Sequence, residues 1–168
     1  MEAALKRAIE NLEIHDVYLR SASIVLAEDF EPKYDSDAES LLVQFKHRVR
    51  RSEVMELEDE NGSMQLLFRV YIDLGARWVD AEEGASMPAA PSADAAPERA
   101  RIDGTMVAEY LMREFLDDES QRLFAHSNAS YHVWPYWREY LSAQCLRTNL
   151  PKITLPAVRT AVNLGDTG

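Results

Sequence analysis

Hydrophobic and polar residues alternate in three stretches of the chain, which is the pattern of β-strands with one polar face. These stretches run from Leu41 to Arg50, from Met64 to Leu74 and from Arg101 to Met112. An earlier stretch, from Val17 to Phe30, is β-like in composition but less regular. Together the four stretches predict a four-stranded sheet.

The segments between the predicted strands differ in character. Asn61 and Gly62 precede the Met64 strand, and both residue types tolerate the positive φ angles of hairpin turns. The strands on either side of this turn should therefore pair antiparallel. The segment from Glu82 to Pro97 is rich in Ala, Pro, Ser and acidic residues and contains few large apolar groups, so we predict a flexible loop there.

Two short helices are predicted outside the sheet. The segment from Glu2 to Leu12 carries apolar residues at spacings of three and four, which is typical of an amphipathic helix. Asp117 and the two acidic residues after it favour a helix N-terminus, and that helix would contain Leu123 and Phe124.

A longer amphipathic helix is predicted from Pro135 to Thr148. A proline is tolerated best in the first turn of a helix, and Asn149 with Pro151 should end this one. Its apolar positions follow steps of three and four residues: Trp134, Trp137, Leu141 and Cys145. After it we expect a short extended piece, 152–156, and a frayed end beyond residue 163.

Composition narrows the class of protein. The chain has 168 residues, 46% of them hydrophobic and 28% charged, which is typical of one globular domain spanning residues 1–168. The net charge of −11 argues against general nucleic-acid binding, which needs a cationic surface. Cys145 is alone, no signal-peptide pattern is present, and no apolar run reaches the length of a membrane span. We therefore expect a cytoplasmic protein without direct membrane insertion.

The sequence contains few residues in arrangements typical of catalytic, metal or cofactor sites. The four histidines lack the spacing of metal ligands, and no Gly-rich phosphate loop follows a strand, so we expect neither a metal nor another cofactor. Asp103 and His132 could form an orienting acid and its base, as a small α+β hydratase would need. Cys145 on the helical stripe fits a packed small hydrophobe better than a nucleophile.

One C-terminal motif resembles a known family. The run Trp134-Pro135-Tyr136-Trp137-Arg138-Glu139 is followed by a helix and then by Leu150-Pro151-Lys152-Ile153-Thr154-Leu155. This arrangement resembles the C-terminal signature of the SecB family of export chaperones, over roughly Ser130 to Pro156. The tryptophan that opens the motif and the extra N-terminal helix are similar to the branch associated with toxin–antitoxin systems.

The resemblance implies a fold and a function. The fold class would be α+β, a four-stranded antiparallel sheet with helices packed on one face, assembled as a dimer of dimers. The function would be ATP-independent binding of unfolded polypeptides in apolar grooves, with a preprotein or an antitoxin segment as the client. The translocase motor protein is a further partner in the export branch. The chain would then not be an enzyme.

The last third of the sequence contains more large apolar residues than one helical stripe requires, so we expect some of them to face a partner. The candidate client-binding residues are Phe115, Leu116, Phe124, Trp134, Tyr136, Tyr140, Leu150, Ile153 and Leu155. The candidate oligomer-interface residues are Trp137, Leu141 and Cys145. The alternative is that this stripe is core, as aromatic residues at helical spacing usually are.

The polar side of the Leu41 strand departs from the family pattern. SecB receives the motor protein on an acidic sheet surface, whereas this strand presents Lys46, Arg48 and Arg50. Either these cations, with Arg69 and Arg101, repel a cationic partner, or they are a solvated face paired with acidic residues. The candidate acidic partners are Asp73, Glu109 and Glu53.

Overall fold

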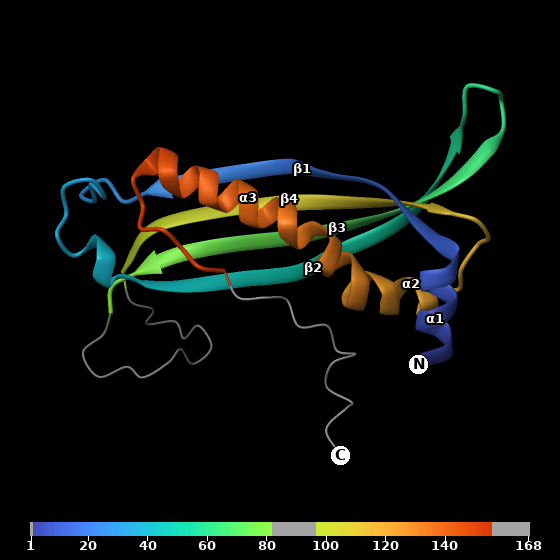
Figure 1. Ribbon diagram of the computed structural model, residues 1–168, viewed down its shortest axis with the longest axis horizontal. Coiled ribbons are helices and arrows are strands. Elements are labelled where there is room, and N and C mark those ends of the chain that lie inside the picture. Colours follow the sequence, from blue (N-terminus) through green and yellow to red (C-terminus); the bar gives the residue numbers. More distant parts are fainter. Residues whose placement is uncertain (1, 82–96, 156–168) are drawn as a thin grey trace, which may run out of the picture.

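The computed structural model describes residues 2–81 and 97–155 (Figure 1). It contains helix α1 (Glu2–Asn11), strands β1 (Leu12–Leu26), β2 (Leu42–Glu58), β3 (Met64–Val79) and β4 (Glu98–Met112), and helices α2 (Asp118–Phe124) and α3 (Ser130–Thr148). A short 3-10 helix, Ala38–Ser40, precedes β2, and a π-helical turn, Ala125–Ala129, joins α2 to α3. The predicted loop lies outside the described residues except for Pro97, and so does the predicted frayed end.

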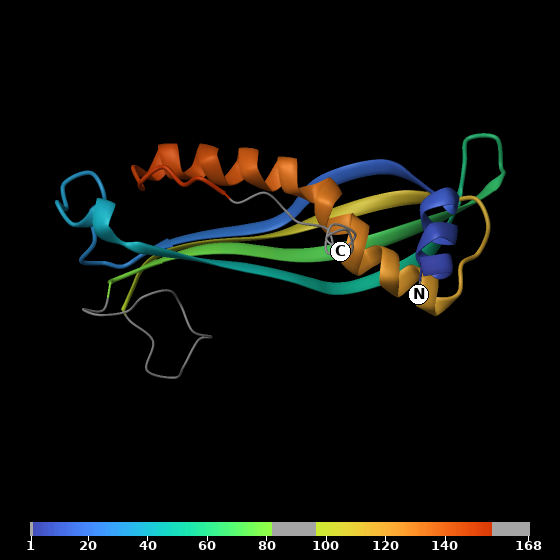
Figure 2. The same cartoon turned by 60° about the horizontal axis from the view of Figure 1, so that its bottom comes forward.

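The strands form one antiparallel sheet in the order β1-β4-β3-β2, so β1 and β2 are its edges. Helices α2 and α3 lie on one side of this sheet, and α1 packs beside α2 at one end (Figures 1 and 2). The predicted fold class, an α+β sheet with helices on one face and an additional N-terminal helix, is confirmed. We call the side with α2 and α3 the helix face and the other side the open face.

The core lies between the helix face of the two central strands and the helices above them. Every second residue of β3 points into it, and its partners on β4 do the same; for example, Phe68 pairs with Tyr110 and Ile72 with Met106. Such side chains each contribute about 1.5–3 kcal/mol on burial. The Phe124 ring from α2 closes this end of the core edge-on against Tyr110, with ring centroids 4.9 Å apart.

The C-terminal helix starts earlier than predicted. It begins at Ser130 and is continuous with α2 through the π-helical turn, so Pro135 lies inside it. A proline in a helix removes one backbone hydrogen bond and crowds the preceding turn, a cost that packing on the sheet must offset here. The helix ends as predicted at Asn149, whose φ of 55° is the left-handed conformation of a C-cap.

Three strands are longer than the alternation predicted, and bulges explain part of the difference. The register shifts between Val49 and Arg51 on β2, so the inward-facing phase changes there and β2 continues to Glu58. Two further shifts interrupt β1, between Ile14 and Asp16 and between Leu19 and Ser21. A one-residue insertion reverses which positions face inward, so period-two alternation cannot be followed across it.

Candidate functional site

Apolar side chains remain uncovered on the helix face of both edge strands. On β1 these are Ile14, Leu19 and Ile24, which we call the β1 strip. They belong to the helix face because Ile14 pairs with Tyr110 and Ile24 with Ile102, both buried in the core. The helical layer therefore leaves the outer strand of the sheet partly uncovered.

The second uncovered region lies on β2. Val43 and Phe45, which we call the β2 strip, pair with Trp78 and Ala76 and so lie on the helix face. Phe45 is 44% exposed, and Val43 packs at the margin of the core. Ile153, in the segment after α3, packs against the same core. The β2 strip thus combines apolar side chains with the free backbone edge of a strand.

Helix α3 divides its aromatic residues between the core and the surface. Trp137 is buried against the sheet, whereas Trp134 and Tyr140 are half-buried on either side of it. Tyr136 is 51% exposed and Leu146 is 82% exposed. The same helix therefore supplies both core anchors and uncovered apolar groups.

The predicted client-binding residues separate by burial into three groups. Phe115 and Tyr136 are exposed, and Trp134, Tyr140 and Ile153 are half-buried. The others belong to the core of the single chain: Leu116, Phe124, Leu150 and Leu155. Composition alone does not show which of these apolar residues turn inward, and Leu116, Leu150 and Leu155 lie outside helices and strands, where no fixed period indicates it.

The three predicted interface residues belong to the buried side of α3 in the single chain: Trp137, Leu141 and Cys145. Burial raises the pKa of the Cys145 thiol to about 11, which keeps it protonated at neutral pH. Sequence reasoning did not select Phe45 or the β1 strip as candidate site residues. The alternation places Phe45 on an apolar face, but only the strand order shows that β2 is an edge.

The candidate acid–base pair of Asp103 and His132 is not formed. Asp103 lies on the open face of β4, where it contacts Lys46 and Arg101. The His132 ring lies on the helix side, with its Nδ1 2.9 Å from the Tyr110 hydroxyl, and burial lowers its pKa. The sheet separates the two side chains, so this feature gives the hydratase alternative no support.

The other histidines do not suggest a metal centre either. His47 Nε2 lies 2.7 Å from Ser130 Oγ, and desolvation together with the nearby His126 lowers the pKa of His47. Within residues 2–81 and 97–155, no group of three or more His, Cys, Asp or Glu side chains could hold a metal ion.

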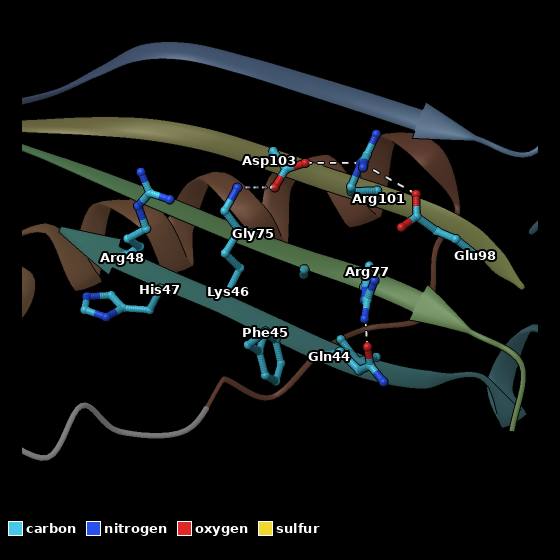
Figure 3. Close-up of a pocket in the computed structure, with 12 residues that line it drawn as sticks. Gln44, Phe45, Lys46, His47, Arg48, Gly75, Arg77, Glu98, Arg101 and Asp103 are labelled. Carbon is cyan, nitrogen blue, oxygen red and sulfur yellow. Dashed lines mark hydrogen bonds and ion pairs between the residues drawn. The ribbon is translucent and has the colours of Figure 1, made fainter. Parts of the chain in front are cut away.

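The open face is polar at its centre. A groove of about 790 Å³ crosses β2, β3 and β4 there, on the side of the sheet away from α3 (Figure 3). Outside this groove, Arg50 pairs with Asp73 at 3.4 Å, and Arg69 pairs with Glu109 at 2.6 Å and with Glu53 at 3.6 Å, as expected for the alternative of cations paired with acidic residues. Much of the cationic surface is therefore neutralised locally.

Comparisons with known proteins connect this geometry to one fold. No family model matches the sequence, and no curated protein matches it. Among solved structures, the SecB-like chaperone Rv1957 of Mycobacterium tuberculosis, in complex with a ChAD peptide from the HigA1 antitoxin Rv1956, aligns with a TM-score of 0.61. The alignment covers 94% of this chain and 97% of that chain at 17% identity. The chain has the SecB-like fold.

The sequence resemblance is thereby confirmed for the fold. In this SecB-like fold, most of the exposed large apolar side chains lie on the two edge strands and on α3, and the others lie on α1, at the start of β3 and in the connecting segments. Among the described helices, none is both long and apolar enough to cross a membrane.

Proposed function

We propose that the protein is an ATP-independent holding chaperone that binds extended, apolar segments of unfolded polypeptides. The observation that carries the proposal is the β2 strip, where uncovered apolar side chains border a free strand edge. Such an edge offers main-chain hydrogen bonds to an extended peptide, and alternate side chains of that peptide then meet the apolar surface. The exposed Phe115 and Tyr136, with the half-buried Trp134, Tyr140 and Ile153, extend the proposed client surface.

The proposed mechanism is mass action and uses no cofactor. A protein that binds only the unfolded client withdraws it from folding, aggregation and proteolysis, in proportion to the free chaperone concentration over its dissociation constant. The similar mycobacterial structure holds an antitoxin peptide, which supports a polypeptide as the ligand class. We favour an antitoxin segment over an exported preprotein, in a cytoplasmic setting.

The open face gives a reason for this preference. The translocase motor protein docks on an acidic sheet surface in SecB, whereas the groove here carries Lys46, Arg48, Arg77 and Arg101. A cationic partner would meet like charge on this surface. The proposal is therefore a dedicated chaperone that does not use the export route.

The test is suppression of aggregation of an unfolded model protein, with peptide binding measured by fluorescence anisotropy. Phe45→Ala and Tyr136→Ala should each weaken binding by about 1 to 3 kcal/mol, the cost of truncating an aromatic anchor. Tyr34→Ala is the matched control, because Tyr34 is exposed but lies in the segment between β1 and β2. Equal binding by all three variants and the parent protein would remove this surface from the proposal.

A further inference from the structure

The groove on the open face has an excess of positive charge in a strongly acidic protein. Its lining includes four cationic side chains against two carboxylates, a local excess of two positive charges, whereas the whole chain carries a net charge of −11. Figure 3 shows these side chains on the side of the sheet away from α3. The charged residues are Lys46, Arg48, Arg77, Arg101, Glu98 and Asp103.

Only part of this positive charge is neutralised within the protein. Asp103 lies 3.5 Å from Lys46 Nζ and 3.2 Å from Arg101 Nε, and Glu98 lies 3.6 Å from the same Arg101 Nε, so the two carboxylates of the groove pair with Lys46 and Arg101 only. Arg77 Nε donates to the neutral amide oxygen of Gln44 at 2.6 Å. Arg48 is exposed and has no ion-pair partner in the part of the chain that the structure describes. The groove is thus prepared for anionic groups, above all at Arg48.

Two of these cations, Lys46 and Arg48, lie on β2, an edge strand of the sheet. β2 pairs with β3 on one side only, and it is free of bulges from Leu42 to Val49. Edge strand β1 is interrupted by two register shifts within its 15 residues, which makes it the poorer template for an added strand. Of the two edges, β2 is the one that an extended peptide can extend without a change of register.

The two faces of β2 differ in chemistry at alternate positions. Val43 and Phe45 lie on the helix face, while Lys46 and Arg48 lie on the open face, about 6–7 Å apart along the strand. A strand added at this edge would place its own alternate side chains beside these two rows. Opposite charges on neighbouring strands stabilise the pair, and like charges destabilise it. The same cations disfavour pairing of β2 with β2 of a second copy.

We propose that β2 selects its client by pattern: it binds an extended segment that alternates apolar and acidic residues as an added antiparallel or parallel strand. The apolar side chains lie over the β2 strip, and the carboxylates lie on the open face beside Arg48 and compete with Asp103 for Lys46. This inference rests on the proposed chaperone function and adds the chemical class of segment that the site prefers. It assigns Lys46 and Arg48 as specificity-determining residues.

The test uses the full chain and three labelled peptides of equal length with the same alternate valines. The intervening positions are Glu in the first peptide, Ser in the second and Lys in the third. Fluorescence anisotropy at low salt should show the Glu peptide binding about tenfold more tightly than the Ser peptide, with the Lys peptide weakest. Raising the ionic strength should reduce these differences, because solvent-exposed charge pairs are screened.

Two variants and one matched control test whether Lys46 and Arg48 cause the preference for the Glu peptide. Arg48→Glu and the milder Lys46→Gln should lose the preference for the Glu peptide, and Arg48→Glu should favour the Lys peptide. Lys33→Glu changes the net charge as much as Arg48→Glu does, at a site outside the sheet, and should retain the preference. Retention of the preference in both β2 variants, or its loss in the control, would overturn the assignment.

A second measurement tests strand addition itself. N-methylation of the alternate peptide amides that face β2 should abolish binding, whereas methylation of the intervening amides should leave it nearly unchanged. Equal effects of the two methylation patterns would exclude an added strand. Competition by single-stranded DNA as strong as that by the Glu peptide would show a general polyanion surface and would also overturn the proposal.

The experiments distinguish failure of the charge-pattern inference from failure of the proposed chaperone function on which it rests. If the Ser and Glu peptides bind equally and the protein still suppresses aggregation, the chaperone function stands and the charge-pattern inference fails. If none of the peptides binds and aggregation proceeds unchanged, both fail.

Discussion

Gly104 of β4 makes room for the indole ring of Trp137. A Cβ atom at Gly104 would lie 2.9 Å from Trp137 Cζ3 and 3.2 Å from Leu19 Cδ1, both closer than a normal carbon contact. The absence of a side chain at this position lets α3 approach the sheet. The buried Trp137 and the glycine beneath it therefore form one packing unit that fixes the position of the helix.

Gly104→Ala should destabilise the protein by about 1–3 kcal/mol, because an added methyl group overpacks a filled core. Urea unfolding monitored by tryptophan fluorescence measures this loss. The matched variant is Gly75→Ala, on the neighbouring strand β3. Its new methyl carbon would lie 2.4 Å from Asp103 Oδ1, a partly exposed carboxylate on the open face that can rotate away by giving up its contacts with Lys46 and Arg101. Gly75→Ala should therefore cost less, and the reverse order would contradict the packing argument.

The sequence predicted this unit only in part. The helical spacing placed Trp137 and Leu141 on the apolar stripe of α3, and the structure buries both. Gly104 lies in a strand that the alternation also found, but no local pattern indicates which helical residue crosses above it. Contacts between elements depend on how the helix crosses the sheet, and residue spacing does not specify that.

The candidate site, too, could be predicted only as far as the local sequence pattern determines it. The alternation assigned Phe45 to an apolar face of its strand, as the register confirms. Its exposure depends on β2 lying at the edge of the sheet, which follows from the strand order. Leu116 and Phe124 were candidate client-binding residues on composition alone, and the structure places both in the core of the single chain.

Cys145 should react slowly with thiol reagents in the folded protein. It lies on the buried side of α3, and burial raises its thiol pKa to about 11, so little thiolate is present near neutral pH. Labelling with a chromogenic disulfide at neutral pH should become fast only after urea unfolds the chain. Rapid labelling of the native protein would show that this end of α3 opens locally.

Stability should fall as the pH drops below the ordinary histidine pKa of 6.5. Burial lowers the pKa of His132, so the unfolded chain binds this proton more readily than the folded chain. The neutral ring therefore contributes stability that is present above that pKa and is lost as the pH falls through it. Urea unfolding at about pH 7.5 and about pH 5.5 should show the loss.

Substitution of His132 tests whether this residue causes the loss of stability at low pH. His132→Gln should be less stable than the parent protein at the higher pH and should lose less on acidification. The exposed His15 on β1 gives the control, so His15→Gln should keep the full pH dependence. An unchanged pH dependence in His132→Gln would assign the effect to other groups, such as His47, whose pKa is also lowered.

Arg69, Glu109 and Tyr18 form a network of polar contacts on the open face. We expect this network to stabilise the folded protein. Arg69 lies 2.6 Å from Glu109, which also accepts a hydrogen bond from the Tyr18 hydroxyl at 3.0 Å. Both charged side chains are largely shielded from solvent. Glu109→Gln should therefore cost about 1–3 kcal/mol, because it leaves the Arg69 charge without its closest partner.

A double-mutant cycle with Arg69→Met measures the coupling between the two residues. The double variant should be more stable than the sum of the single losses predicts, since neither charge is then left unpaired. The surface pair of Arg113 and Glu13, which lies 3.4 Å apart and is mostly exposed, is the comparison and should show coupling of only a few tenths of a kcal/mol. Equal coupling in both pairs would contradict this account.

The last prediction concerns self-association. The β1 strip leaves three large aliphatic side chains uncovered on the helix face, and Leu146 projects from α3 with 82% of its surface exposed. A second copy would cover these apolar side chains in a closed, symmetric interface. We expect this contact at β1 because the cations of β2 repel a second β2.

Light scattering at micromolar concentration should give about four times the 19.1 kDa chain mass, with a dimer as the smallest acceptable assembly. Leu19→Lys and Leu146→Lys should each shift the population toward smaller species, because each places a charge in the proposed contact. Met64→Lys, at an exposed position where β3 begins, is the control and should leave the mass unchanged. A monomeric parent protein that still suppresses aggregation would refute the assembly and leave client binding at β2 intact, since the β2 strip and its free edge belong to one chain.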